Sequence, residues 1–277
     1  MNWRLWGLTM CLGSFVIPLP SNTQNFADIS PFFNRENLSD TQLYEKGRII
    51  TVKLLSDGEH IGSGIIIKQN RNQYLVVTNA HVIRAASSSY QVQTFDNKVY
   101  LATEVKTVNF GEDDLGLLQF FAAEKTYAVA KLGKSLSLKE GDKVYAVGFP
   151  FSGYNNSHYK TKKIPDIQSD EFAFKSGKVV SILNKALEGG YQVGFNNDVY
   201  KGMSGGPLLN QKGEVVAING RHAQPLWDAT EYYEDGSQPS LSLQQIIIHS
   251  SWAVPVERMG LISEPNSLDF RAVFWSD

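Results

Sequence analysis

The chain has 277 residues, of which 42% are hydrophobic and 19% charged, and this composition excludes an intrinsically disordered protein. A formal net charge of −2 and the lack of long lysine and arginine runs argue against a general nucleic-acid-binding protein. The densest basic cluster contains Lys160, Lys162 and Lys163, and it is typical of a short solvated loop.

Residues 1–20 have the pattern of a signal peptide. Arg4 is their only charged residue, and residues 5–19 are mostly apolar. The segment is interrupted by Pro18 and Pro20 and is too short for a stable membrane span, which needs about 20 apolar residues. We therefore predict an extracytoplasmic protein, secreted or periplasmic. No Ala-x-Ala sequence precedes Ser21, so an uncleaved anchor is the alternative.

The only cysteine, Cys11, lies within this segment. Without it the mature chain has no cysteine, so we predict a fold held by packing instead of disulfides. A cysteine nucleophile and a thiolate metal site are excluded for the same reason. The histidines outside the motifs below do not pair at a metal-ligand spacing, and the sequence predicts no metal and no cofactor. They are His60, His158, His222 and His249.

Residues 21–44 are polar and are interpreted as an N-terminal arm. From Arg48 onward, short β-branched runs alternate with turn residues, a pattern that predicts an all-β sandwich or barrel. The clearest runs are residues 49–52, 65–67, 74–77, 144–147, 179–182 and 215–218. No long helix is expected, and one short helix is predicted at residues 256–262.

Three longer polar stretches interrupt the strands, at residues 152–170, 187–191 and 222–244. Loops of this kind in a compact domain often carry function. The last stretch is acidic, and two interpretations remain open: a solvated surface loop, or a lip that recognises a substrate. Its acidic residues are Asp228, Glu231, Glu234 and Asp235.

The most specific chemical signal is the sequence Gly-Met-Ser-Gly-Gly-Pro at residues 202–207. A serine nucleophile needs donors for the negative charge that develops on the attacked carbonyl oxygen. Glycine at position 202 allows the backbone to turn its N–H inward. The N–H groups of Gly202 and Ser204 are therefore candidates for an oxyanion hole.

The same residues match the Gly-x-Ser-x-Gly nucleophile elbow of α/β-hydrolases. An elbow serine begins a helix, whereas residues 207–209 and 215–218 are typical of strands. The acid and histidine of that fold must also follow the serine, and few residues follow Ser204. This alternative predicts a helix-rich protein, and the sequence disfavours it.

Two upstream residues complete a candidate triad. His81 follows an apolar run, and an imidazole can accept the serine proton and return it near neutral pH. Asp114 directly precedes an apolar run, as expected for a buried carboxylate that orients the imidazole, whereas Asp113 fits a turn or a strand cap. The order His, Asp, Ser is one of those that catalytic triads use.

The three blocks around His81, Asp114 and Ser204 resemble the signature of trypsin-like, chymotrypsin-fold serine peptidases. They are most similar to the disulfide-free bacterial branch that includes the HtrA/Deg protease domain. Residues 62–67, 213–219 and 252–255 also look like strands of that branch, so the resemblance covers residues 48–262. It implies two six-stranded antiparallel β-barrels with the active site between them. The first barrel would span residues 45–122, a linker 123–140, the second barrel 141–262 and a tail 263–277.

The resemblance implies a serine endopeptidase that acts on peptide or protein substrates through an acyl-enzyme. His81 would be the general base, Asp114 the orienting carboxylate and Ser204 the nucleophile, with Gly202 and Ser204 as the oxyanion hole. The alternative is a catalytically silent homologue that binds peptides or acts as a chaperone. Nucleic acid is not an expected partner, and the motifs do not indicate an oligomeric state.

Two features depart from the wider family. Animal trypsins have an aspartate before the serine that pairs with a newly freed N-terminus, and Met203 cannot make that pair. No activating cleavage at Arg48–Ile49 is therefore expected. Few residues follow Ile262, so we expect no PDZ domain, and the likeness concerns the protease domain alone.

Substrate preference has two open interpretations. Asp198 lies six residues before Ser204, where trypsins have the base of the specificity pocket, and a buried carboxylate there would favour lysine or arginine before the cut bond. Alternatively, Asp198 is an exposed loop residue or pairs with Arg221 or Lys201. Arg221 in the pocket could instead attract acidic side chains of the substrate. The expected pocket wall consists of Asn219, Gly220 and Arg221.

Overall fold

The computed structural model describes residues 37–87, 89–151, 172–223 and 231–260. The predicted signal peptide, the polar arm up to residue 36, the lysine cluster, Asp228 and the predicted tail lie outside these residues. Within the described part of the chain, no helix is long and apolar enough to cross a membrane.

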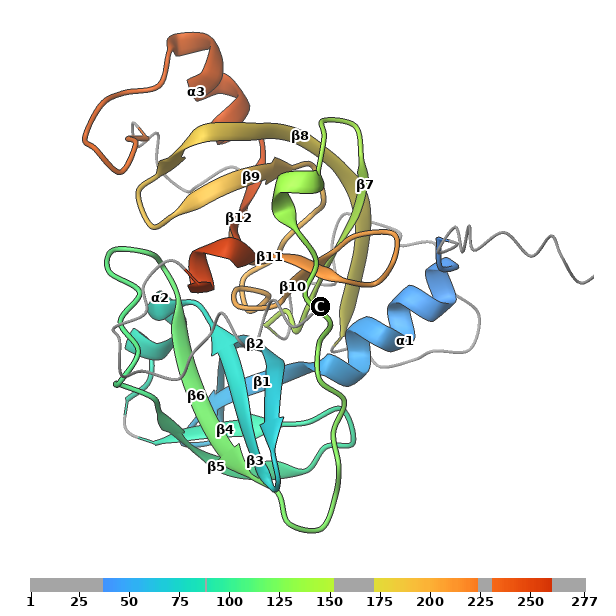
Figure 1. Ribbon diagram of the computed structural model, residues 1–277. Coiled ribbons are helices and arrows are strands. Elements are labelled where there is room, and N and C mark those ends of the chain that lie inside the picture. Colours follow the sequence, from blue (N-terminus) through green and yellow to red (C-terminus); the bar gives the residue numbers. More distant parts are fainter. Residues whose placement is uncertain (1–36, 88, 152–171, 224–230, 261–277) are drawn as a thin grey trace, which may run out of the picture. The chain divides into compact units, whose positions relative to one another are not determined.

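Two closed six-stranded barrels make up the fold (Figure 1). The first has the order β1-β2-β3-β6-β5-β4 and the second the order β10-β11-β12-β9-β8-β7, and the strand pairs are antiparallel. The predicted fold class is therefore confirmed. The first barrel contains β1 Thr51–Ser56, β2 Glu59–Asn70, β3 Gln73–Thr78, β4 Tyr90–Gln93, β5 Val99–Glu104 and β6 Gly116–Phe121. The second contains β7 Lys143–Gly148, β8 Ala173–Leu187, β9 Tyr191–Phe195, β10 Pro207–Leu209, β11 Val215–Arg221 and β12 Ser251–Pro255.

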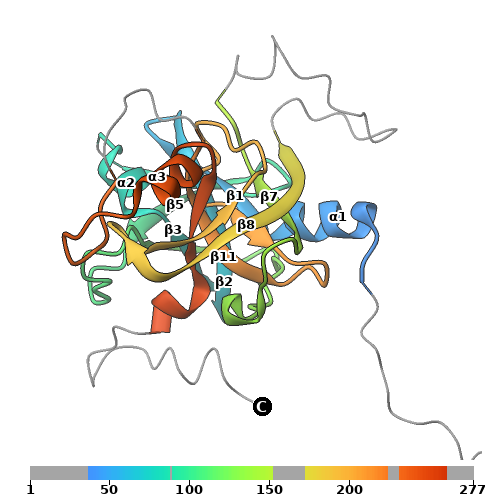
Figure 2. The same cartoon turned by 90° about the horizontal axis from the view of Figure 1, so that it is seen from above.

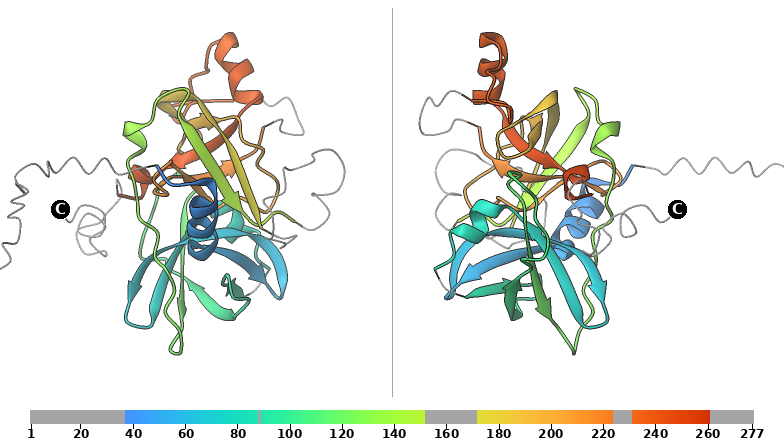
Figure 3. Two further views of the ribbon diagram at one scale, coloured as in Figure 1. Left: turned by 90° about the vertical axis from the view of Figure 1, so that its right-hand side faces the viewer. Right: turned by 60° about the vertical axis from the view of Figure 1, so that its left-hand side comes forward.

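Each barrel encloses its own apolar core. In the first barrel the rings of Tyr74 and Phe120 stack with centroids 5.0 Å apart, beside the buried Val52 and Val76. In the second barrel, Phe195 and other buried residues fill the corresponding space. Closing each sheet on itself removes the unpaired strand edges that an open sheet would expose. Two further views show that the two sets of strands keep to separate halves (Figure 3).

The helix α1 Asp40–Ile50 differs from the sequence expectation, which placed residues up to 44 in a polar arm and began a strand at Ile49. A capping box starts the helix, since Ser39 and Gln42 each accept a hydrogen bond from the other's backbone N–H. Leu43 is fully buried, and Tyr145 of β7 donates its hydroxyl to Asp40 at 2.8 Å. The helix thus leads into the first barrel but packs on the second (Figures 1 and 2).

The segment between the barrels, predicted as a linker at residues 123–140, contacts both of them. Ala130 donates its N–H to the Ile66 carbonyl in β2 at 2.8 Å. Leu132 forms a parallel bridge with Val215 of β11, and the short 3₁₀ helix η1 Ser135–Ser137 follows. The linker therefore ties the first barrel to the second.

The stretch predicted as an acidic loop at residues 222–244 is ordered where the structure describes it. The helix α3 Leu241–Ile248 begins inside it. Its described acids form ion pairs with the body of the domain, which favours a structural role for them over a free recognition lip. The pairs are Arg221–Glu231, Arg258–Glu234 and Lys185–Asp235. The predicted terminal helix corresponds to the 3₁₀ helix η2 Val256–Gly260. The remaining helix, α2 Ala80–Arg84, follows β3.

Replacing Leu43 by alanine tests whether α1 belongs to the folded domain. Leu43→Ala is expected to lower the free energy of unfolding by about 2–5 kcal/mol, because it leaves a cavity against the second barrel. Urea denaturation measures the change, with Thr41→Ala on the exposed face of α1 as the matched control. Equal stability of the two variants would show that α1 does not pack on the barrel.

Candidate active site

His81 lies in the first turn of α2, directly after β3. At the end of β3, the Thr78 hydroxyl donates to the Ser63 carbonyl at 2.7 Å. The Asn79 amide group donates to the Asp114 carbonyl at 2.8 Å, and the His81 backbone N–H donates to Asp114 Oδ1 at 2.9 Å. The backbone that carries the imidazole is therefore held by contacts to β2 and to Asp114.

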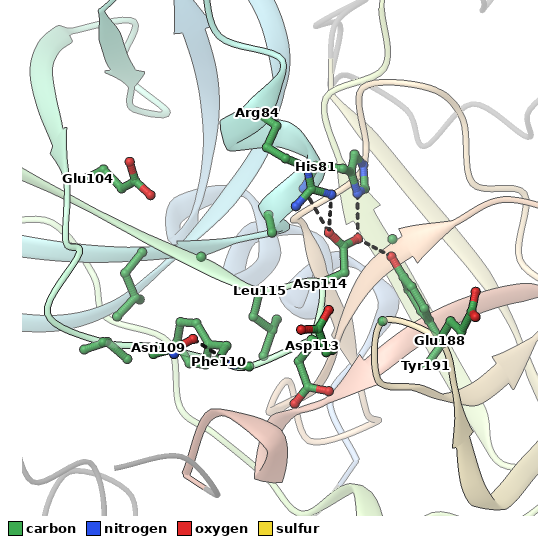
Figure 4. Close-up of a pocket in the computed structure, with 18 of the residues that line it drawn as sticks. His81, Arg84, Glu104, Asn109, Phe110, Asp113, Asp114, Leu115, Glu188 and Tyr191 are labelled. Atoms are coloured by element: carbon green, nitrogen blue, oxygen red, sulfur yellow. Dashed lines mark hydrogen bonds and ion pairs between the residues drawn. The ribbon is translucent and has the colours of Figure 1, made fainter. Parts of the chain in front are cut away.

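The Asp114 carboxylate holds the imidazole through its second oxygen. Oδ2 accepts a hydrogen bond from His81 Nδ1 at 2.6 Å and another from the Tyr191 hydroxyl (Figure 4). Burial raises the pKa of Asp114, but the hydrogen bond and charge of His81 and the Tyr191 hydroxyl outweigh it, so this pKa lies below its usual value. An ionised carboxylate can only accept hydrogen bonds. Nδ1 therefore carries the imidazole proton, and Nε2 is left as an acceptor.

Asp113 points to a different partner. Its carboxylate accepts a hydrogen bond from the Arg258 guanidinium at 2.9 Å, and its side chain is 6% exposed. Burial raises the pKa of Asp113, and this effect is larger than the lowering by the charge of Arg258. The structure thus places Asp114, and not its neighbour, against His81, and its role as the orienting carboxylate stays a prediction.

Ser204 and His81 line the same cavity, which has a volume of about 540 Å³. The Ser204 hydroxyl donates to the Gly220 carbonyl at 3.3 Å, and the Ser204 carbonyl accepts from the Ser63 N–H at 2.9 Å. The imidazole comes from the first barrel and the hydroxyl from the second. The two predicted reactive groups therefore meet at one cavity between the barrels.

The orientation of the peptide before Gly202 is set by a hydrogen bond to Phe151. The Lys201 carbonyl accepts a hydrogen bond from the Phe151 N–H at 2.9 Å. Since C=O and N–H point in opposite directions across a trans peptide, the Gly202 N–H points away from Phe151. Gly202 has a φ of +94°, and a Cβ there would lie 2.6 Å from the Phe149 carbonyl oxygen. Only glycine fits this backbone position.

The peptide before Ser204 is fixed in a similar way. The Met203 carbonyl accepts from the Gly206 N–H at 3.0 Å, and the Gly202 carbonyl accepts from the Ser63 hydroxyl at 2.8 Å. Among the described residues, the N–H groups of Gly202 and Ser204 have no acceptor. They are available to a ligand in the cavity.

Met203 stands where animal trypsins have a charged aspartate. It is fully buried, and its sulfur accepts a contact from the Tyr200 N–H at 3.4 Å. The Arg48–Ile49 bond lies inside α1, where Arg48 pairs with Glu45 at 3.3 Å. The loop is thus held by neutral hydrogen bonds and packing, and the lack of an activating cleavage stays a prediction.

The cavity is lined differently from the sequence expectation. Asp198 is exposed and does not line it, so it is not a buried carboxylate at its base. Asn219 is fully buried and donates inward to the carbonyls of Val147 and Pro207, so its side chain supports the second barrel and not the cavity wall. The walls are Ile61, His81, Ala85, Phe151, Lys201, Gly202, Ser204, Gly220, Arg221, His222, Glu231, Ile247 and Trp252.

Arg221 and Gly220 line the cavity, and their role as the wall of a substrate pocket stays a prediction. The Arg221 guanidinium pairs with Glu231, donates to the Glu188 carbonyl at 2.9 Å and lies 4.5 Å from the centroid of the Tyr191 ring. Its charge is therefore already balanced within the protein. Desolvation by burial, followed by the charge of Lys201, lowers the pKa of the neighbouring His222.

Sequence reasoning missed Tyr191, Ile247 and Trp252 at this site. Tyr191 stands after two glycines at the end of a predicted loop, and its contact with Asp114 joins residues far apart in the chain. Trp252 was identified only as part of a closing strand. No local pattern marks Ile247 and Trp252 as cavity-lining residues, or Tyr191 as a partner of Asp114.

A family model described as the trypsin-like peptidase domain matches residues 62–218, more than half of the chain. The chain belongs to the trypsin-like peptidase family. The matched segment contains His81, Asp114 and Ser204.

Similar proteins include the serine protease Do-like HtrA of Bacillus subtilis, which is 34% identical over 165 residues, covering 57% of this chain and 32% of the relative. The mitochondrial serine protease HTRA2 of Drosophila virilis is 31% identical over 159 residues, covering 57% of this chain and 34% of the relative. The chain thus spans about a third of the length of these relatives.

Among solved structures, the HtrA-type protease AlgW with tripeptide has a similar fold, with a TM-score of 0.53 at 19% identity. The match covers 79% of this chain and 60% of that one. At this identity the likeness concerns the fold, which agrees with the two barrels described above.

The exposure of Asp198 predicts that it does not select basic substrates. Asp198→Ala is expected to change the ratio of kcat/KM for lysine or arginine over apolar residues before the cut bond by less than about two-fold, because solvent screens an exposed charge. A peptide-library cleavage profile measures this ratio. Glu231→Gln is the matched control inside the cavity, and it should improve cleavage after acidic residues by leaving Arg221 unpaired. Loss of basic preference in Asp198→Ala alone would contradict this assignment.

Proposed function

We propose that this chain is a serine endopeptidase in which Ser204, His81 and Asp114 form a catalytic triad. The observation that supports this most directly is the cavity shared by His81 and Ser204. The imidazole there is backed by an ionised carboxylate, and the N–H groups of Gly202 and Ser204 have no acceptor within the described part of the chain, so they can bind an oxyanion. Family membership supports the same reaction class.

The reaction begins when the Ser204 hydroxyl leaves the Gly220 carbonyl and turns toward His81 Nε2. His81 accepts the serine proton as Ser204 Oγ attacks the peptide carbonyl carbon, and Asp114 stabilises the imidazolium. The imidazolium then protonates the leaving amine, and the C–N bond breaks to give an acyl-enzyme. Water attacks the ester by the same proton transfers, which releases the acid and restores the serine.

The negative charge on the tetrahedral intermediate would be stabilised by the N–H groups of Gly202 and Ser204. Loss of one such donor typically reduces kcat by about 10²–10³-fold. These donors are fixed before substrate binds, because their peptides are held by Phe151, Ser63 and Gly206. Little reorganisation is therefore needed as charge develops.

The lining of the cavity includes four large apolar side chains, those of Ile61, Phe151, Ile247 and Trp252. An apolar side chain before the cut bond fits this lining better than a basic one, because Lys201 stands at the same cavity. A tripeptide accompanies the similar HtrA-type protease AlgW, which supports a peptide substrate here. Residues 1–20 remain the basis for proposing an extracytoplasmic location.

A fluorophosphonate probe separates the peptidase from a catalytically silent homologue. We expect the probe to label Ser204, with labelling abolished in Ser204→Ala and retained in Ser242→Ala, a serine on the exposed start of α3. Ser204→Ala and His81→Ala should each lower kcat by about 10⁶-fold, because the triad acts as a unit. A folded wild-type protein that neither labels nor cleaves peptides would favour the silent homologue.

Paired aspartate variants test which carboxylate orients the imidazole. Asp114→Asn should lower kcat by about 10⁴-fold, because an amide favours the wrong imidazole tautomer. Asp113→Asn should leave kcat nearly unchanged and lower the stability of the fold, because it breaks the pair with Arg258. Steady-state kinetics and urea denaturation measure both effects. A larger loss of kcat in Asp113→Asn would reverse the assignment.

A further inference from the structure

The Tyr191 hydroxyl makes a contact with the candidate triad that the proposed mechanism does not use. Tyr191 begins β9 in the second barrel and is 2% exposed. Its hydroxyl donates to Asp114 Oδ2, the same oxygen that accepts the His81 Nδ1 proton. Figure 4 shows the two bonds converging on one carboxylate oxygen.

We propose that Tyr191 is a positioning residue that fixes the Asp114 carboxylate in the orientation that holds His81. The proposal rests on the triad put forward above. It adds a second-barrel residue to the histidine and aspartate of the first barrel. Tyr191 would therefore align the general base with the serine across the boundary between barrels.

The space for the Tyr191 hydroxyl depends on Gly220. A Cβ at position 220 would lie 2.2 Å from that oxygen and 2.6 Å from the ring carbon Cε1, both far inside contact distance. The Gly220 carbonyl also accepts the Ser204 hydroxyl. The glycine beside the nucleophile thus leaves room for the tyrosine that contacts the aspartate.

Other contacts hold Tyr191 in place. The Arg221 guanidinium lies over its ring, 4.5 Å from the centroid, and is itself fixed by Glu231 and the Glu188 carbonyl. The Asp114 backbone N–H donates to the Gly189 carbonyl at 2.9 Å. The loop before β9 therefore contacts the backbone of Asp114, and the first residue of β9 contacts its side chain.

The electrostatic surroundings keep Tyr191 a donor. Burial and the charge of Asp114 raise its pKa well above its usual value, so the hydroxyl stays protonated. Among the described residues, Arg84 of α2 also faces the carboxylate, at 3.8 Å from Oδ1, and Arg221 of β11 lies over the Tyr191 ring. The neighbouring Asp113 carboxylate forms an ion pair with Arg258. Removal of the tyrosine hydroxyl would leave these groups in place. One lone pair of Asp114 Oδ2 would then be buried without a hydrogen-bond donor.

Tyr191→Phe tests the proposal because it keeps the ring and removes the hydroxyl. We expect kcat to fall by about 10- to 100-fold with little change in KM, the range for a lost hydrogen bond to a charged group. The carboxylate without this donor has a higher proton affinity and holds the imidazolium more strongly. The acid limb of the kcat/KM profile should therefore move to higher pH.

Tyr145→Phe is the matched control. Tyr145 is equally buried in the second barrel and also donates to an aspartate, Asp40 of α1, far from the triad. The Tyr145→Phe variant should be less stable than the wild type but keep the wild-type pH profile. If both variants show the same kcat and the same acid limb, Tyr191 is only a packing residue. Should Tyr191→Phe fail to fold, Gly220→Ala displaces the hydroxyl with the tyrosine retained and must shift the acid limb in the same direction.

A readout without turnover separates this proposal from the proposed function. In the Ser204→Ala background, proton NMR follows the titration of the His81 ring, assigned by its loss in His81→Gln. Tyr191→Phe should raise the titration midpoint and Tyr145→Phe should not. An unchanged midpoint overturns the positioning role even if the wild-type enzyme is an active peptidase. A raised midpoint supports it even if the fluorophosphonate test fails.

Discussion

The reactive groups are divided between two barrels, so the site depends on hydrogen bonds that fix one barrel against the other. Ser63 of the first barrel is fully buried and binds the backbone on both sides of Met203, through the carbonyls of Gly202 and Ser204. A buried polar group that loses its partner costs about 1–3 kcal/mol. The position of the serine is therefore set as much by β2 as by its own barrel.

Two of the carboxylates near the site are paired with arginines, and the carboxylate of Asp114 is hydrogen-bonded to the imidazole of His81. Asp113 is bound by Arg258 and Glu231 by Arg221, while Asp114 is bound by His81 and Tyr191. Burial alone would favour a neutral Asp114, and its hydrogen bonds reverse that effect. This division of partners explains how two adjacent aspartates come to have different surroundings.

The sequence predicted the parts of the fold and site that depend on local pattern. Short β-branched runs indicated an all-β sandwich or barrel, and the resemblance to trypsin-like peptidases implied two barrels. The glycine at position 202 indicated a backbone with inward N–H groups. The exposure of Asp198 could not be predicted, because it depends on how the loop before Ser204 folds. Tyr191 was missed because its contact with Asp114 forms only when the barrels meet. The helix α1 was missed because its buried face is short and its N-terminal turn is polar.

The path of α1 has a consequence for the order of folding. Leu43 and Gly47 of α1 pack in a cluster with Val147 and Leu209 of the second barrel, residues that leave the ribosome much later. Strands β1 to β6 have all their pairing partners within the first barrel and can close during synthesis. The helix ahead of them must stay undocked until β10 has been made, so its attachment is among the last steps of maturation.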